Sequence, residues 1–97
     1  MAVNAGKKIL LVDDDDALRE SLSEQLRLHE EFTTSEGATG SAGLDAVKHE
    51  HFDAILLDVG LPDMDGREVC RILRRNNVSC PVVMLTAAES DADTILG

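Results

Sequence analysis

Two short apolar runs that each stop at aspartate constrain this chain more than any other feature. Residues 9–12 are followed by four consecutive aspartates at 13–16, and residues 55–57 are followed by Asp58. Runs of this length that are rich in branched apolar side chains predict strands buried on both faces of a parallel sheet. Because open α/β sheets bind their ligands at the carboxyl ends of the strands, the two runs would deliver carboxylates to one edge.

Carboxylates that converge at such an edge repel one another. At a separation of about 4 Å each pair costs on the order of 1 kcal/mol in water, and several times more at a partly buried site. A bound cation relieves this repulsion, and ligands that are all oxygen atoms favour a hard ion such as Mg²⁺. The sequence therefore predicts a magnesium site where the two acidic ends meet.

Four strands and three helices are expected in alternation, which favours an α/β domain. The strands are expected at residues 8–12, 32–35, 53–58 and 81–85, with the second polar enough to lie at a sheet edge. The helices are expected at residues 16–28, 39–50 and 66–75, and residues 91–97 read as the opening of a further helix. Asp15 or Asp16 is expected to cap or begin the first helix, and Asp65 to cap the third.

The spacing of apolar residues predicts which helix faces are buried. Leu18, Leu22 and Leu26 recur at i, i+4 and i+8 and form the expected inner stripe of the first helix. In the second helix Leu44 and Val47 are expected to face the sheet, although two glycines near its start weaken the helix. The expected apolar face of the third helix consists of Val69, Cys70 and Leu73.

The excess of acidic residues argues against two classes of partner. The chain has 19 Asp and Glu against 9 Lys and Arg, a formal net charge of −10. Direct nucleic-acid binding needs a basic face, and anionic membrane surfaces attract basic segments, so neither is expected. No apolar run approaches the roughly 20 residues of a membrane span, and no signal peptide is apparent. We therefore expect one small cytoplasmic domain over residues 1–97, with Cys70 and Cys80 as free thiols.

Four motifs together resemble the receiver domain of two-component response regulators. They are the acidic pair Asp13-Asp14 after the first strand, and residues 52–58, 61–66 and 81–87, which read FDAILLD, LPDMDG and PVVMLTA. These motifs cover nearly the whole chain in the order and spacing of that family. The resemblance implies an α/β fold with a flavodoxin-like doubly wound parallel sheet of order 2-1-3-4, whose fifth strand and last helix are absent from this chain.

The resemblance also implies a role for each matching residue at the acidic edge. Asp58 corresponds to the phosphoacceptor, which takes a phosphoryl group from a sensor histidine kinase or phosphotransfer protein as an acyl phosphate. Asp14 corresponds to a direct ligand of Mg²⁺, and Asp13 to an acid that holds the ion mainly through water. Gly60 corresponds to the residue whose backbone carbonyl binds the metal.

The residues after the fourth strand carry both a match and a departure. Thr86 corresponds to a hydroxyl that bonds a phosphoryl oxygen, and Ala87 to a small residue that leaves room for that group. The family's lysine at the end of a fifth strand has no counterpart, because the lysines stand only at positions 7, 8 and 48. We interpret the chain as a receiver domain incomplete at its C-terminal side, and expect its uncovered strand edge and apolar face to favour a homodimer.

Other interpretations of the acidic motifs are weaker. A haloacid-dehalogenase-like phosphohydrolase would also form an aspartyl intermediate, but it needs a general acid two residues after Asp58, where this chain has Gly60. A calcium loop over residues 61–72 would place leucine and isoleucine at its first and twelfth positions, where neither can ligate the ion. A receiver that binds partners without phosphorylation is disfavoured by the intact acids. We therefore expect a phosphorylation-controlled signalling switch that is not a turnover enzyme, with the hydrolase as the alternative.

Overall fold

The computed structural model describes residues 6–29 and 31–85, which form four strands and three helices in alternation. Along the chain these are β1 (Lys7–Val12), α1 (Asp16–Arg27), β2 (Phe32–Gly37), α2 (Gly40–His49), β3 (Ala54–Asp58), α3 (Gly66–Arg75) and β4 (Val82–Leu85). Every predicted element within these ranges is present, with ends that shift by no more than two residues. None of the described helices has the length and apolar character that a bilayer crossing requires.

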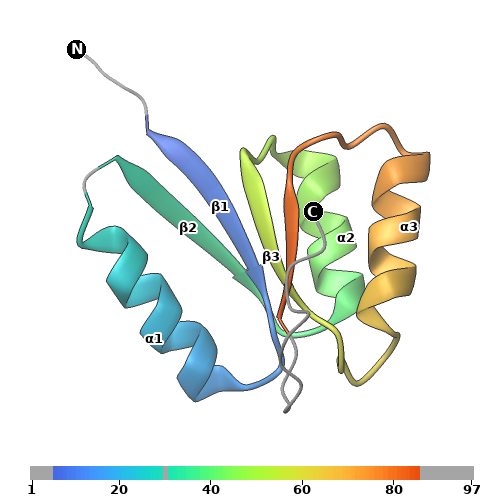
Figure 1. Ribbon diagram of the computed structural model, residues 1–97, viewed down its shortest axis with the longest axis horizontal. Helices are drawn as coiled ribbons and strands as arrows, with labels where there is room; N and C mark the ends of the chain where they lie inside the picture. The colour runs from blue at the N-terminus through green and yellow to red at the C-terminus, as the bar shows by residue number, and fades with distance from the viewer. Residues whose placement is uncertain (1–5, 30, 86–97) are drawn as a thin grey trace.

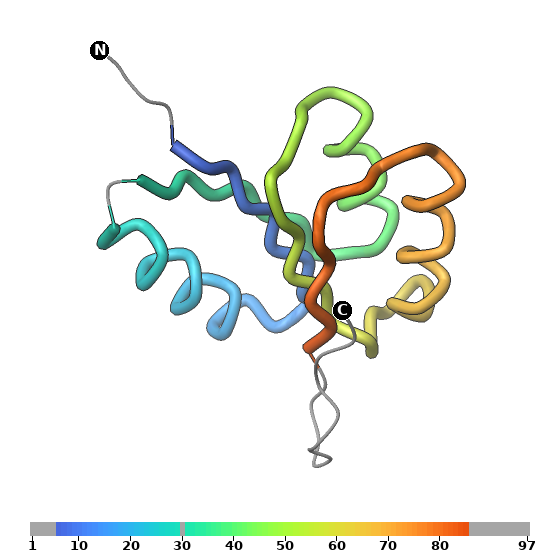
Figure 2. The backbone as a smooth tube through the Cα atoms, turned by 45° about the horizontal axis from the view of Figure 1, so that its top comes forward, coloured from blue at the N-terminus to red at the C-terminus, as the bar shows by residue number. Residues whose placement is uncertain are grey.

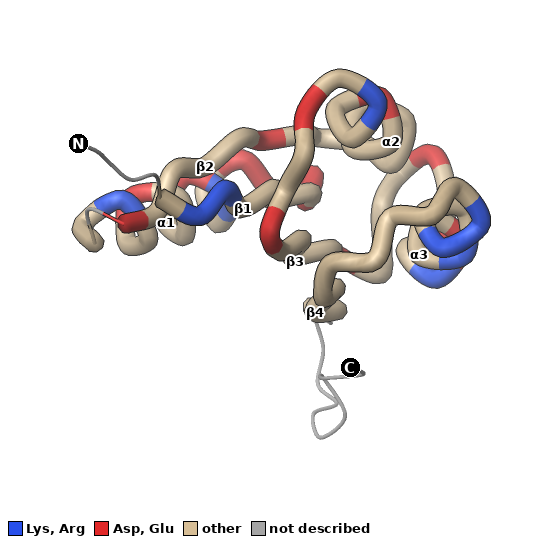
Figure 3. The backbone as a smooth tube through the Cα atoms, turned by 90° about the horizontal axis from the view of Figure 1, so that it is seen from above, with Lys and Arg blue, Asp and Glu red and all other residues tan. Residues whose placement is uncertain are grey.

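The strands form one parallel sheet of order β2-β1-β3-β4, so β2 lies at an edge, as its polar sequence predicts (Figure 1). In the register of the two central strands, Val12 of β1 stands beside Leu57 of β3. The helix α1 lies on one face of the sheet, and α2 and α3 lie on the other (Figure 3). This arrangement confirms the predicted flavodoxin-like α/β fold over the described residues.

The main core lies between the sheet and the pair α2 and α3. Alternate residues of each strand point to this side, because successive side chains of a strand face opposite ways. The largest of them are fully buried, and burial of each such leucine or isoleucine contributes about 1.5–3 kcal/mol. The core residues are Leu10, Val12, Phe52, Ile55, Leu57, Leu61, Val69, Leu73, Val82 and Met84. Leu44 and Val47 of α2 pack against this core, as predicted.

The helix α2 approaches the sheet closely because Gly43 has no side chain. A Cβ at this position would lie 2.8 Å from Cγ2 of Val12, which is closer than real Cβ contacts allow. A glycine that weakens the helix as a local structure therefore permits its packing against β1. The close contact with Val12 explains why glycine stands at position 43, although it lowers the helix propensity of this segment.

The predicted inner stripe of α1 is wrong at its first position. Leu18 is 44% exposed, whereas Ser23, which the leucine pattern leaves out, is 1% exposed. The Ser23 hydroxyl shares a 2.7 Å hydrogen bond with the Thr34 hydroxyl of β2. Because α1 covers a polar edge strand, the helix turns a hydroxyl inward to meet Thr34. Of the three leucines of the predicted stripe, Leu22 and Leu26 are half-buried.

Aspartate or threonine side chains cap all three described helices at the end of the sheet where β1, β2 and β3 finish. Asp15 accepts a hydrogen bond from Leu18 N–H at 3.0 Å, Thr39 from Ala42 N–H at 3.0 Å, and Asp65 from Arg67 N–H at 2.8 Å. Such caps satisfy N–H groups that have no partner within the helix. They also fix the loops that follow the strands, and the acidic site lies among these loops.

Candidate metal centre

Three aspartates from two adjacent strand ends converge at one edge of the sheet. Asp13 follows the last residue of β1, Asp14 comes next, and Asp58 ends β3. Each offers a carboxylate oxygen, and these oxygens all lie within 4.8 Å of one another. The loops that follow β1 and β3 lie at the same end of the sheet (Figure 2). Parallel pairing of the two strands therefore produces the cluster directly.

The three carboxylates differ in their exposure to solvent. Asp13 is only 4% exposed, Asp58 is half-buried and Asp14 is exposed. A cation at the cluster could therefore bind oxygen atoms at the sheet while keeping water on its exposed side. Mg²⁺ typically retains several waters and takes one or two protein carboxylates.

The backbone and side chain of Asp13 are held by several hydrogen bonds. Its N–H donates to the carbonyl of Gly37 at the end of β2, at 3.0 Å. Its Oδ1 accepts from Asp15 N–H at 2.9 Å, and its own carbonyl accepts from the guanidinium of Arg19. The sequence did not predict this bond from Arg19, because no motif places the arginine beside the acids.

The environment of Asp58 disfavours its charged form. Partial burial raises the pKa of this carboxyl above its usual value, and the negative charges of Asp13 and Asp14 raise it further. The Gly60 N–H, 3.3 Å from Asp58 Oδ1, opposes this shift only in part. A bound cation would reverse the balance, because it favours the ionised form of all three acids.

A glycine keeps the chain close behind Asp58. A Cβ at Gly66 would lie 2.5 Å from the Asp58 carbonyl oxygen and 2.8 Å from Cα of Val59. The Gly66 N–H also donates to the Val59 carbonyl at 2.9 Å. The start of α3 therefore packs directly on the end of β3, which fixes the strand end that carries Asp58.

Few basic groups are available to neutralise the cluster among the described residues. Lys7 and Lys8 lie at the far end of β1 (Figure 3), and Arg67 at the start of α3 pairs its charge with Asp65 at 3.7 Å. Arg19 contacts the backbone at Asp13 but pairs its charge with Asp16 and Glu36. The donor set of three converging carboxylates thus fits a hard divalent cation such as Mg²⁺.

The structure describes only some of the other predicted site residues. Gly60 lies in the loop that follows β3, with its N–H directed to Asp58, and its role as a carbonyl ligand of the metal stays a prediction. Thr86 and Ala87 lie outside the described residues. The motif residues Asp63 and Asp65 serve as acceptors for the N–H groups of α2 and α3. These caps account for the two acids that give the loop its likeness to a calcium site.

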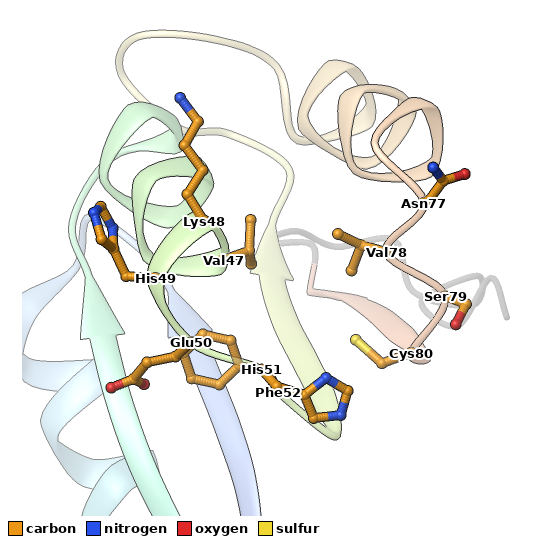
Figure 4. A pocket seen from close by; sticks show the side chains of 10 residues that line it. All are labelled: Val47, Lys48, His49, Glu50, His51, Phe52, Asn77, Val78, Ser79 and Cys80. Carbon is orange, nitrogen blue, oxygen red and sulfur yellow. The ribbon is translucent and has the colours of Figure 1, made fainter.

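A pocket of about 380 Å³ lies at the opposite end of the sheet from the aspartates. It is lined by the end of α2, the turn before β3 and the loop before β4 (Figure 4). Val47, Phe52, Val78 and Cys80 supply its apolar part. None of the three clustered acids lines it, so this pocket is separate from the charged site.

Comparison with known proteins places this geometry in one family. The family model of the response regulator receiver domain matches residues 9–96. The DNA-binding response regulator MtrA of Mycolicibacterium smegmatis is 45% identical over 91 residues, which is 94% of this chain and 39% of that protein. The transcriptional regulatory protein AfsQ1 of Streptomyces coelicolor is 39% identical over 92% of this chain and 39% of its own length. The chain thus spans about two fifths of these relatives.

Solved structures show the same likeness in three dimensions. The CheY-like receiver domain protein from Methanospirillum hungatei aligns with a TM-score of 0.82 at 32% identity, over 89% of this chain and 68% of that one. The response regulator TrrA of Thermotoga maritima, solved in complex with Mg(2+)-BeF, aligns with a TM-score of 0.79 at 30% identity. That alignment covers 86% of this chain and 71% of TrrA.

Proposed function

The chain belongs to the response regulator receiver domains, and on this premise we propose that Asp58 is its phosphoacceptor in two-component signal transduction. The phosphoryl group would come from the phosphohistidine of a sensor kinase or a phosphotransfer protein, in a reaction that depends on Mg²⁺. One observation carries the proposal. The carboxylate of Asp58 stands at a strand end with those of Asp13 and Asp14, their oxygens all within 4.8 Å of one another.

The proposed reaction is a phosphoryl transfer between two side chains. An oxygen of Asp58 attacks the phosphorus, a P–O bond forms, and the P–N bond to the donor histidine breaks with its electron pair returning to the imidazole nitrogen. The product is an acyl phosphate. Such transfers depend mainly on positioning and on neutralisation of charge. The half-buried position of Asp58 suits this role, because its strand fixes the carboxylate while one side stays open to the donor.

Asp13, Asp14, Asp58 and the backbone carbonyl of Gly60 are the groups that we propose hold the metal. When bound, Mg²⁺ would supply positive charge to the transferring phosphoryl oxygens. The related TrrA was solved in complex with Mg(2+)-BeF, which supports a magnesium site in this fold. Thr86 would bond a phosphoryl oxygen through its hydroxyl, and Ala87 would leave room for the group.

The haloacid-dehalogenase alternative receives no support from the family match or from the relatives. The residue two positions after Asp58 is Gly60, which has no side chain to transfer a proton. We therefore propose a cytoplasmic signalling switch that assists its own phosphorylation and is not a turnover enzyme. The predicted homodimer stays a prediction, which light scattering of the purified protein would test.

Phosphorylation by a small donor tests the assignment of Asp58. Incubation with acetyl phosphate and Mg²⁺ should add one phosphoryl group, measured by intact mass, and the product should react with hydroxylamine as an acyl phosphate does. Asp58→Asn should abolish the addition. Asp45→Asn, which changes an exposed aspartate of α2, serves as the matched control and should leave it unchanged. Equal incorporation in wild type and Asp58→Asn would show that another residue is the acceptor.

A further inference from the structure

Arg19 connects three parts of the structure through one guanidinium group. Its Nε donates to Glu36 Oε1 in β2 at 2.9 Å, and its Nη2 donates to Asp16 Oδ1 in the first turn of α1 at 2.6 Å. Its Nη1 donates to the backbone carbonyl of Asp13 at 2.5 Å. The side chain is 14% exposed, so it is held within the structure and does not extend into solvent.

With the contact from Arg19, both backbone polar groups of Asp13 are hydrogen-bonded. The N–H of Asp13 is bound by the carbonyl of Gly37 at the end of β2, and its carbonyl is bound by Arg19. Both hydrogen bonds tie Asp13 to β2. The first reaches Gly37 directly, and the second reaches the strand through Arg19, whose guanidinium is anchored by the neighbouring Glu36. The backbone of Asp13 is therefore fixed on either side of its Cα, from which its carboxylate extends to the cluster.

We propose that Arg19 is a positioning residue for the metal centre, which holds the backbone at Asp13 so that the carboxylates of Asp13 and Asp14 meet that of Asp58. The inference rests on the magnesium site proposed above. In the structure Arg19 bonds to the carbonyl of Asp13 and to no carboxylate of the cluster, so it would act through the backbone. Groups that orient metal ligands in this way typically change metal affinity by about 10- to 100-fold when they are removed.

The geometry of the side chain explains why arginine suits this position. A guanidinium presents its donors in a rigid planar fork, so three acceptors can be satisfied at once. A lysine ammonium at the same place keeps the positive charge but is a compact group on a flexible stem, and it cannot reproduce the fork. Arg19→Lys therefore separates the geometric role of the residue from its charge.

The charge of Arg19 alone predicts the opposite effect on metal binding. A positive group near the cluster repels a cation, so its removal would tighten Mg²⁺ binding if charge were its only influence. If Arg19 positions Asp13, its removal would weaken binding in spite of the lost repulsion. The sign of the change in Arg19→Gln thus distinguishes the two roles.

Calorimetric titration with Mg²⁺ tests the proposal directly. We expect Arg19→Lys and Arg19→Gln each to weaken Mg²⁺ binding by about tenfold or more. Arg27→Gln is the matched control, because it removes the same charge from the same helix, and the Arg27 guanidinium donates to the Ser23 carbonyl at 3.5 Å, within α1 itself. This control should bind Mg²⁺ at least as tightly as the wild type. Thermal unfolding curves recorded by circular dichroism without metal show whether each variant is folded.

Each result decides for or against the role of Arg19. Wild-type affinity in Arg19→Lys, or tighter binding in Arg19→Gln, would overturn it. Should both variants fail to fold, Glu36→Gln takes their place, because it keeps Arg19 but weakens the anchor that holds its guanidinium against the Asp13 carbonyl. A severalfold loss of Mg²⁺ affinity is then expected, and an unchanged affinity overturns the inference. A wild type that binds no Mg²⁺ would instead defeat the proposed metal site, so the two failures are distinguishable.

Discussion

The carboxylate of Asp63 accepts a hydrogen bond from the backbone N–H of Gly40 at 2.8 Å, across 23 positions in the sequence. The other oxygen of the same carboxylate accepts from Ser41 N–H at 2.9 Å. Asp63 lies in the loop between β3 and α3, and the two N–H groups begin α2. The loop that carries Gly60 is therefore fastened to the start of a neighbouring helix, where N–H groups and the helix dipole favour a negative charge.

This contact predicts a dependence of stability on pH. The N–H groups of Ser41 and Gly40 lower the pKa of Asp63 below its ordinary value. The folded state therefore prefers the ionised carboxylate, and its contribution to stability is fully present above the unfolded pKa and is lost as pH falls through the folded one. Asp63→Asn should lower the melting temperature modestly at neutral pH, and by less at an acidic pH below the unfolded pKa. An equal effect at both pH values would contradict this role of the charge.

Asp58 should affect stability in the opposite direction. Burial, with the charges of Asp13 and Asp14, raises its pKa, so the folded state holds its proton more tightly than the unfolded chain. Stability then falls as pH rises from the unfolded pKa through the raised one, and at neutral pH the full penalty is present. Asp58→Asn should raise the melting temperature at neutral pH without Mg²⁺, by a small amount because water screens this half-exposed site. A lower melting temperature would contradict the repulsion argument.

Magnesium should stabilise the folded protein by binding it in preference to the unfolded chain. At a free concentration of 100 times the dissociation constant the gain is about 2.7 kcal/mol. Asp14→Ala should remove most of this gain, because it deletes one of the three converging carboxylates. Thermal melts with and without Mg²⁺ measure the difference, and Asp45→Ala provides an exposed aspartate as control. Equal magnesium shifts in wild type and Asp14→Ala would exclude a direct role for Asp14.

The acidic site could be predicted from sequence because it depends on local pattern and on one topological rule. Residues 9–12 and 55–57 are apolar enough to identify buried strands, and parallel neighbours bring their carboxyl ends together. The relation between Asp13 and Asp58 follows from these two facts. No knowledge of side-chain packing is needed to place either residue at the sheet edge.

Features that depend on pairing between distant segments could not be predicted in the same way. Arg19 reaches Glu36 only because β1 pairs with β2 in the register that sets Leu11 beside Glu36. The exposure of Leu18 likewise depends on which strand α1 covers. The leucine spacing indicates an amphipathic helix, but the hydroxyl of Thr34 on the edge strand decides that Ser23 faces inward.

Gly66 and Gly60 offer a matched test of how closely the start of α3 must approach β3. A Cβ at Gly66 would meet the backbone of Asp58 and Val59 at 2.5 and 2.8 Å, whereas a Cβ at Gly60 would have no atom within 4 Å. Backbone cannot rotate away as a flexible side chain can, so Gly66→Ala must displace the end of β3 and the start of α3 relative to one another. We expect a loss of stability of about 1–3 kcal/mol, as for other overpacked sites.

The same displacement should impair the site, because the end of β3 carries Asp58. Gly66→Ala should therefore weaken Mg²⁺ binding as well as lower the free energy of unfolding in denaturant titrations. Gly60→Ala keeps its backbone carbonyl and has space for the methyl group, so both quantities should stay close to those of the wild type. Equal losses in the two variants would mean that glycine is needed in this loop for flexibility. A loss confined to Gly66→Ala would show that close packing behind Asp58 fixes the geometry of the acids.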